Sequence, residues 1–208
     1  MNMSLLRKLS DAYGPPGREE DVMEILKTEL ESYADDIKVD KLGNIHFWHR
    51  GNKEKPLIML AAHMDEVAFL VRHIEDQGYL RLHSWGVVTN ILPGQRMLFR
   101  GRKGDLRGVV GTKPPHIMNE DERKKTIALE DLFADIGTCT RDEAESRGAY
   151  EGMSGVFDVD FLDLGLGYVR GKALDDRAGC FVMAEVFKSL KDAPTTSSPW
   201  GQSRKRSA

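Results

Sequence analysis

An apolar run in the middle of the chain ends abruptly in a polar cluster. Residues 56–62 have the sequence Pro-Leu-Ile-Met-Leu-Ala-Ala and are followed at once by His63-Met64-Asp65-Glu66. A continuous apolar run of this length predicts a parallel strand buried on both faces, because helices cover both sides of a parallel sheet. In open α/β sheets, ligands gather at the carboxyl ends of the strands. We therefore expect His63 and Asp65 to lie at a ligand-binding edge.

A second polar cluster occurs at residues 172–179, with the sequence Lys-Ala-Leu-Asp-Asp-Arg-Ala-Gly. Imidazole and carboxylate groups are usual ligands of zinc, and a carboxylate near a ligating histidine can hold its second ring nitrogen. Each cluster alone is weak evidence. His63 and Asp65 are equally consistent with a solvated turn, and Asp175 and Asp176 with a helix N-terminus, where acidic residues complement the dipole. Their joint occurrence favours a metal site.

Six segments, in their order along the chain, resemble the M42 family of metallopeptidases, the glutamyl aminopeptidase and tetrahedral aminopeptidase group. The segments are Ala-Tyr-Gly-Pro-Pro-Gly-Arg-Glu-Glu (12–20), Asp-Lys-Leu-Gly-Asn (40–44), Ala-His-Met-Asp-Glu-Val (62–67), Lys-Pro-Pro-His (113–116), Asp-Ile-Gly (135–137) and Gly-Lys-Ala-Leu-Asp-Asp-Arg (171–177). The resemblance extends from about residue 5 to residue 190 and is specific because of this order.

The resemblance implies an α/β fold: an incomplete zinc-peptidase-like core (1–66 and 164–192) with an inserted small all-β dimerisation domain (67–163). It implies that His63 ligates one metal, that Asp175 bridges two divalent ions, zinc or cobalt, and that Asp65 orients the catalytic site. The expected activity is removal of amino-terminal residues from peptides by two-metal-activated water. The full-length protein is expected to form a homo-oligomer.

Hydrophobic periodicity predicts the individual elements. Helices are expected over 4–12 and 18–33, where the apolar residues of the second helix recur at helical spacing, and a further helix follows Asp175. Short strands separated by turn residues are expected over 37–39, 45–49 and 57–62. Within the inserted domain the expected strands are 68–74, 79–83, 96–100, 106–111, 131–136 and 156–161.

The tail departs from the family pattern. A two-metal peptidase needs a carboxylate base and further ligands, and in the family a Glu-Glu pair follows about thirty residues after the residue equivalent to Asp175. The corresponding positions here are Arg204, Lys205 and Arg206. For one choice of synonymous codons, a one-base shift of residues 200–208 yields Val-Gly-Thr-Val-Gln-Glu-Glu-Val-Gly-Leu. We therefore predict a frameshift near Asp192, leaving residues 193–208 as an aberrant, disordered tail.

Two functional classes remain open. The chain is either an M42 metallo-aminopeptidase made inactive by truncation or a non-catalytic remnant that acts only as a β assembly module. A glycoside hydrolase would need two opposed carboxylates, and no such pair is evident. A net charge of −3 argues against nucleic-acid binding, and the sequence has no apolar run long enough for a membrane span. The start lacks a signal-like apolar region, so a cytoplasmic location is expected, with Cys180 a buried thiol.

Overall fold

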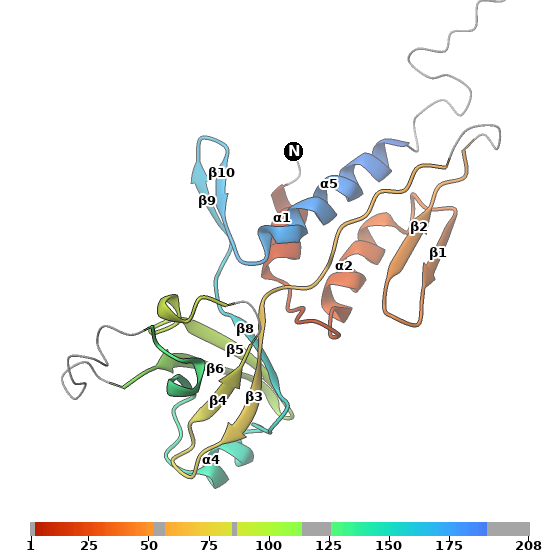
Figure 1. The fold of residues 1–208 in the computed structure, drawn as a ribbon. Coiled ribbons are helices and arrows are strands. Elements are labelled where there is room, and N and C mark those ends of the chain that lie inside the picture. Colours follow the sequence, from red (N-terminus) through yellow and green to blue (C-terminus); the bar gives the residue numbers. More distant parts are fainter. Residues whose placement is uncertain (1–2, 52–56, 85–86, 114–125, 191–208) are drawn as a thin grey trace, which may run out of the picture.

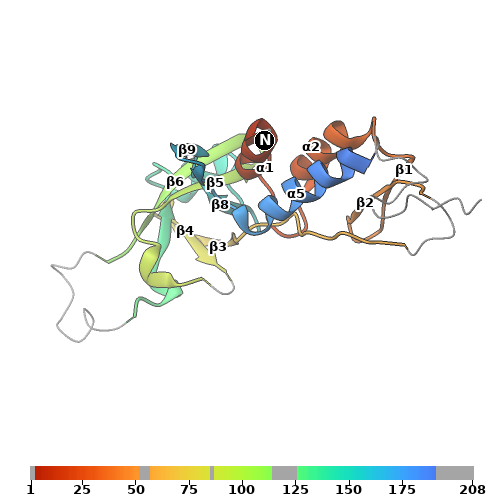
Figure 2. The same ribbon diagram turned by 90° about the horizontal axis from the view of Figure 1, so that it is seen from above.

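The computed structural model describes residues 3–51, 57–84, 87–113 and 126–190. The fold is mixed α/β: a closed barrel of antiparallel strands stands beside a group of helices flanked by two small hairpins (Figure 1). Seen from above, the barrel and the helices lie side by side, and the hairpin of β1 and β2 lies at the end of the helical group far from the barrel (Figure 2). His116 and the predicted disordered tail lie outside the described residues.

The barrel has six strands, in the spatial order β3-β4-β7-β6-β5-β8, and β8 pairs back with β3 to close it. The strands are β3 (Ala68–Ile74), β4 (Leu80–His83), β5 (Arg96–Gly101), β6 (Gly104–Gly111), β7 (Phe133–Asp135) and β8 (Ser154–Phe157). Short 3-10 helices, η1 (Thr89–Ile91) and η3 (Leu129–Asp131), lie in the connections. The expected strands are thereby confirmed, although the last one lies earlier in the chain than 156–161.

Alternation of burial explains why these segments form a barrel. On β5, Met97 and Phe99 are buried, and on the paired β6, Leu106 and Val110 are buried. Side chains on a strand alternate between its two faces, so each strand directs its apolar set inward. These residues join one continuous cluster inside the barrel. The barrel therefore has a hydrophobic core of its own.

One element corrects the expectation of an all-β segment over 67–163. Residues Arg141–Ser146 form a helix, α4. The Thr140 side chain accepts a hydrogen bond from the backbone N–H of Glu143, and the Glu143 carboxylate accepts one from Cys139. This Thr-x-x-Glu pattern satisfies backbone donors at a helix start, and it was visible in the sequence. The segment is therefore mainly, but not entirely, β.

Helices α1 (Met3–Asp11), α2 (Glu20–Leu30) and α5 (Leu174–Leu190) form the helical group, as expected. Their apolar faces meet in a second core, separate from that of the barrel, whose buried residues are Leu5, Leu6, Leu9, Val22, Leu26, Leu30, Phe161, Cys180, Phe181 and Ala184. Along the described parts of the chain, no helix is both long and apolar enough to cross a membrane.

The predicted strand over 57–62 is wrong. This stretch has no strand assignment, and Leu57, Ile58 and Met59 are 78%, 79% and 83% exposed. It runs as an irregular chain past the helices to the start of β3 (Figure 1). A strand needs a neighbour to pair its backbone N–H and C=O groups, and no described strand pairs with it. Apolar composition alone therefore did not determine its conformation.

Two hairpins complete the fold. β1 (Asp36–Val39) pairs antiparallel with β2 (Ile45–Trp48), as expected, and β9 (Leu162–Gly165) pairs with β10 (Tyr168–Arg170), which was not expected. The first hairpin turns through residues 40–44, where the Asp40 carboxylate accepts hydrogen bonds from the backbone of Leu42 and from both the backbone and the side chain of Asn44.

This turn supplies a pH-dependent prediction. The hydrogen bond from the Asn44 side chain is the main cause that lowers the pKa of Asp40 from 3.8 to about 2. Because the folded pKa lies below the unfolded one, the turn is stabilised above about pH 4, and this stabilisation disappears as the pH falls through about 2. We expect Asn44→Ala to raise the pKa of Asp40 toward its ordinary value, measured by carboxyl NMR titration. Lys41→Ala is the matched control, and an unchanged Asp40 titration in Asn44→Ala would contradict the prediction.

The loop between α1 and α2 joins the helical group to the barrel. Tyr13 Oη lies 2.9 Å from both the carbonyl and the hydroxyl oxygen of Ser154 on β8. Arg100 on β5 binds both carboxylate oxygens of Asp21, at 3.2 and 2.8 Å, and its guanidinium lies 4.2 Å from the centre of the Tyr13 ring. Planar two-point contacts of this kind fix orientation as well as distance. The loop is thus held against the barrel at a defined position.

Candidate functional site

The structure brings together the three residues predicted to form the site. His63 Nε2 lies 3.1 Å from Asp175 Oδ1, although the two residues are 112 positions apart in sequence. On the other side of the ring, His63 Nδ1 lies 3.1 Å from Asp65 Oδ1. The imidazole therefore stands between two carboxylates, one at each nitrogen. His63 and Asp65 lie at the end of the irregular segment rather than at the end of a strand.

The adjacent Asp175 and Asp176 have different surroundings. Both have non-helical backbone angles ahead of the regular turns of α5. The Asp176 carboxylate accepts a hydrogen bond from the backbone N–H of Gly179 at 3.0 Å, which caps the helix. The Asp175 side chain is 97% exposed and faces His63. The helix-terminus interpretation therefore describes Asp176, whereas Asp175 remains available as a ligand.

The carboxylates control the charge of His63. Burial alone lowers the pKa of His63, but the hydrogen bond to Asp175 and the negative charges of Asp65, Asp175 and Asp176 outweigh it and raise the pKa above 6.5. Anionic neighbours stabilise the protonated imidazole, and they would equally attract a cation placed between them. The site is therefore one of negative potential.

A hollow in the surface opens beside His63. It is lined by the turn between β1 and β2, by the start of α2 and by α5, and its lining includes Glu19, Asn44, His63, Asp65 and Cys180. Cys180 is buried, as predicted, and lies within 3.3 Å of the His63 carbonyl oxygen. Burial raises the pKa of its thiol to about 11, so the thiol is protonated near neutral pH. Cys180 therefore supports the segment and does not act as a nucleophile.

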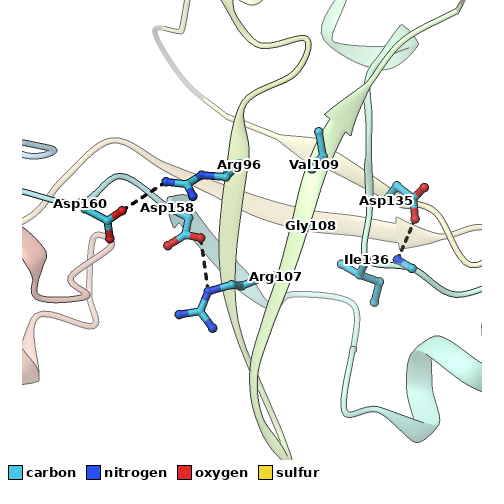
Figure 3. Close-up of a pocket in the computed structure, with 9 residues that line it drawn as sticks. Arg96, Arg107, Gly108, Val109, Asp135, Ile136, Asp158 and Asp160 are labelled. Atoms are coloured by element: carbon cyan, nitrogen blue, oxygen red, sulfur yellow. Dashed lines mark hydrogen bonds and ion pairs between the residues drawn. The ribbon is translucent and has the colours of Figure 1, made fainter.

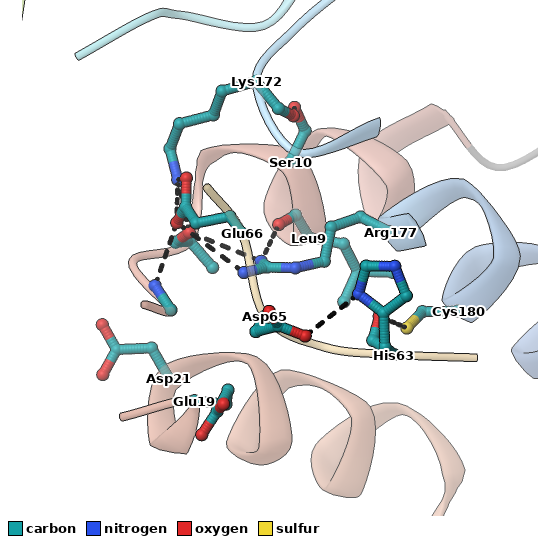
Figure 4. A network of polar contacts seen from close by, with 12 residues as sticks. Leu9, Ser10, Glu19, Asp21, His63, Asp65, Glu66, Lys172, Arg177 and Cys180 are labelled. Atoms are coloured by element: carbon teal, nitrogen blue, oxygen red, sulfur yellow. Dashed lines mark hydrogen bonds and ion pairs between the residues drawn. The ribbon is translucent and has the colours of Figure 1, made fainter. Parts of the chain in front are cut away.

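A buried cluster of charges lies directly behind these residues (Figure 4). Lys172 Nζ donates to both oxygens of Glu66, at 2.7 and 2.8 Å, and to the Ala12 carbonyl at 2.7 Å. Arg177 is fully buried, with Nη1 donating to the Leu9 carbonyl at 2.6 Å and Nη2 lying 3.7 Å from Glu66 Oε1. No pattern in the sequence predicted a role for Glu66, Lys172 or Arg177.

Burial and pairing have opposite effects on this cluster. Burial raises the pKa of Glu66 and lowers that of Lys172, while the charge of each partner counteracts the effect of burial on the other. Burial likewise lowers the pKa of Arg177, again counteracted by Glu66. Since a buried charge is costly unless it is paired and hydrogen bonded, each member depends on the others.

The donor set fits a zinc or cobalt ion in kind but not in number. His63 offers an imidazole nitrogen and Asp175 a carboxylate oxygen, while Asp65 holds the second ring nitrogen, an arrangement seen around ligating histidines. Catalytic zinc sites use three protein ligands. Within the described part of the chain, no group of three or more His, Cys, Asp or Glu side chains could hold a metal ion.

A second hollow lies on the outside of the barrel (Figure 3). Arg96 on β5 and Arg107 on β6 line it, together with Asp135, Asp158 and Asp160. Both arginines already pair with acids: Arg96 with Asp160 at 3.5 Å and Arg107 with Asp158 at 3.3 Å. Its lining contains no histidine or cysteine. Because both arginines are already paired and Asp135 accepts a hydrogen bond from the backbone N–H of Gly137, this hollow is a weaker candidate than the one beside His63.

Comparison with known proteins shows the family. A family model described as M42 glutamyl aminopeptidase matches residues 43–199. This match covers more than half of the chain and includes His63, Asp65 and Asp175. The chain belongs to the M42 peptidase family, as its sequence segments indicated.

Individual relatives and solved structures support the same family assignment. The lysyl aminopeptidase of Pyrococcus furiosus is 33% identical over 193 residues, which are 91% of this chain and 55% of the relative. A crystal structure of a TET aminopeptidase from a marine sediment archaeon of the Thaumarchaeota has a TM-score of 0.87 and 42% identity, over 91% of this chain and 54% of that one. The TET1 peptidase of Pyrococcus horikoshii has a TM-score of 0.77 and 33% identity, over 91% and 56%. The chain thus spans about half the length of these relatives.

Proposed function

We propose that the chain supplies part of the active site of an aminopeptidase that removes amino-terminal residues from peptides. One observation carries the proposal: His63 and Asp175 meet at 3.1 Å from segments 112 residues apart, in a chain of the M42 family. In this proposal His63 and Asp175 are ligands of divalent ions, zinc or cobalt, with Asp175 bridging two of them. Asp65 is the residue that orients His63.

The residues present suggest how this half of the site works. Asp65 Oδ1 lies 3.1 Å from His63 Nδ1, where its charge can hold the ring, and Nε2, which faces Asp175 Oδ1 at 3.1 Å, is the nitrogen that would ligate. Divalent ions in such a site supply Lewis acidity toward the peptide carbonyl and lower the pKa of water. The exposed hollow beside His63 gives a peptide terminus access to these residues.

The division of the chain is part of the proposal. Residues 1–66 and 164–192 form part of the peptidase core, and 67–163 form an inserted domain that takes part in assembly. One observation supports this division: the barrel and the helical group have separate hydrophobic cores. The TET1 neighbour can assemble into a tetrahedron or a large octahedral shell. The full-length protein is accordingly proposed to be a homo-oligomer. Because the chain spans about half of its relatives, we propose that the general base and the remaining ligands lie outside the residues described.

A β assembly module without catalysis was the other functional class that the sequence left open. The barrel alone does not favour it, since the structural match to an aminopeptidase covers 91% of this chain, barrel included. The glycoside hydrolase alternative likewise gains no support from the pairing of His63 with two carboxylates.

Cobalt(II) binding and peptide hydrolysis by the 208-residue chain test the proposal. With two ligands in place of three, we expect weak cobalt(II) binding that perturbs the NMR signals of residues 63 and 175 first, and no measurable hydrolysis of peptides. His63→Ala should remove this perturbation, whereas His73→Ala, on β3, should leave it unchanged. Zinc retained stoichiometrically after dialysis against a mild chelator would contradict the two-ligand account, and cobalt that perturbs other residues first would contradict the assignment of the site.

A further inference from the structure

We propose that Glu66 is a positioning residue: clamped by Lys172 and Arg177, it sets the placement of His63 against Asp175. Its relevance to catalysis rests on the function proposed above, but the placement itself is a property of this chain. Glu66 touches neither of the proposed ligands and directly follows Asp65. Lys172 and Arg177 stand on either side of Asp175 in the sequence.

The segment carrying His63 has few backbone hydrogen bonds to hold it in place. No described strand pairs with residues 57–66, and Leu57 to Met59 are exposed. The segment is attached at its other end by Glu66, whose N–H donates to the Gly14 carbonyl and whose Oε1 accepts from the Gly14 N–H, both at 3.0 Å. At His63 itself, the Cys180 thiol contact is a weak hydrogen bond. Ala62 and Met64 on either side of His63 pack against the helical core, so Glu66 supplies the buried polar attachment of a segment that is otherwise held by apolar contacts.

The Glu66 carboxylate also fixes the segment carrying Asp175. Lys172 binds both Glu66 oxygens, and its own carbonyl accepts a hydrogen bond from Ser10 Oγ at 2.7 Å. Arg177 follows Asp175 by two positions and lies in the same cluster, 3.7 Å from Glu66. One buried carboxylate thus connects the α1–α2 loop, the end of the His63 segment and the start of α5 (Figure 4).

All three charged side chains of the cluster are buried. The side chains of Glu66, Lys172 and Arg177 are 3%, 6% and 0% exposed. Arg177 Nε and Nη2 are buried and have no hydrogen-bond partner among the described residues, so Glu66 supplies the nearby negative charge. A side chain at position 14 would collide with Arg177, since a β-carbon there would lie 2.5 Å from Nη2. The cluster is therefore closely packed around Arg177, and Glu66 is the acidic residue that forms an ion pair with it.

A partly buried ion pair elsewhere in the helical group serves as the control. Glu29 and Lys188 join α2 to α5 in the same helical group at 2.8 Å, and their side chains are 25% and 17% exposed. Solvent reaches this pair and can replace the lost partner, so its loss should have little effect. Glu29→Gln is accordingly the matched control for Glu66→Gln: each removes one carboxylate bound to a lysine, and neither changes the side-chain size.

The test uses the metal-free 208-residue chain and nuclear Overhauser contacts between the His63 ring and the Asp175 side chain. We expect this contact in the unaltered chain and in Glu29→Gln, and its loss in Glu66→Gln, while the signals of Leu26 and Ala184 in the helical core stay unchanged. A contact retained in Glu66→Gln would overturn the proposal. Loss of the contact together with the helical-core signals would also overturn it, because Glu66 would then merely support the helices.

A second variant tests the same cluster through the partner of Glu66. Lys172→Gln leaves Glu66 with Gly14 and with the longer ion pair to Arg177, but it removes both hydrogen bonds between Glu66 and the Asp175 segment, so it too should lose the contact between His63 and Asp175. Retention of that contact in Lys172→Gln would overturn the proposal. Since no metal is added, failure of the metal-binding proposal would appear in the cobalt titration and leave this result unaffected.

Discussion

Replacing His63 or Asp175 by alanine is expected to abolish peptide hydrolysis in the frame-corrected protein, the product of the gene with a single base restored between the codons for Asp192 and Pro194. Each substitution removes one proposed ligand, and a two-metal site acts only while both ions hold the reacting oxygens. We expect the unaltered frame-corrected protein to release amino-terminal residues, to lose activity under chelation and to regain it with zinc or cobalt. Release of the amino-terminal residue from short peptides measures the effect.

Asp65→Asn should have a smaller effect in the same protein. The asparagine no longer offers a full negative charge to His63 Nδ1, so the ring is less firmly oriented, and loss of a group that orients a ligating histidine costs about 10- to 100-fold in affinity or activity. His73→Ala is the matched control, because His73 pairs with Glu151 on the barrel, away from the site. Full activity in His63→Ala, or a corrected frame that lacks the Glu-Glu pair, would contradict the proposal.

Local patterns were sufficient to predict most of the fold. β3 begins and ends where its alternation of apolar residues predicted, and α2 buries Val22, Leu26 and Leu30 at helical spacing. The strand prediction for residues 57–62 was wrong for a physical reason. An apolar run shows that a segment prefers burial, but not which neighbour covers it. Without a pairing strand among the described residues, it remains irregular and exposed.

The sequence predicted the residue types of the site but not all of the contacts between them. Local sequence pointed to His63, Asp65 and Asp175, and the structure places them in contact. The sequence could not reveal that Glu66 meets Lys172, 106 residues later, because long-range pairing of two charges has no local signal. Residue types alone also did not separate Asp175 from Asp176: the family resemblance selected Asp175, and the hydrogen bond from Gly179 assigns Asp176 to the helix cap.

The most damaging change for the barrel is expected to be Phe99→Ala. Phe99 is fully buried, and its ring occupies the space that a β-carbon at Gly155 would enter. Removing a buried phenylalanine costs about 3–5 kcal/mol, through lost burial and through the cavity that remains. Val109→Ala, on β6 with a side chain 47% exposed, is the control and should change the free energy of unfolding by less than about 0.5 kcal/mol. Chemical denaturation measures both values.

Limited proteolysis extends this prediction to the whole chain. Because the barrel has its own core, chymotrypsin should cut first at the exposed residues 57–60 and in the β9–β10 hairpin, where Leu166 and Tyr168 are 99% and 71% exposed. We expect a protected fragment of about residues 67–160. In Phe99→Ala this fragment should be degraded, whereas in Val109→Ala it should persist. Uniform protection as far as Leu190 would show instead that the helical group and the barrel unfold as one unit, and that the irregular segment before β3 is held more firmly than its exposure indicates.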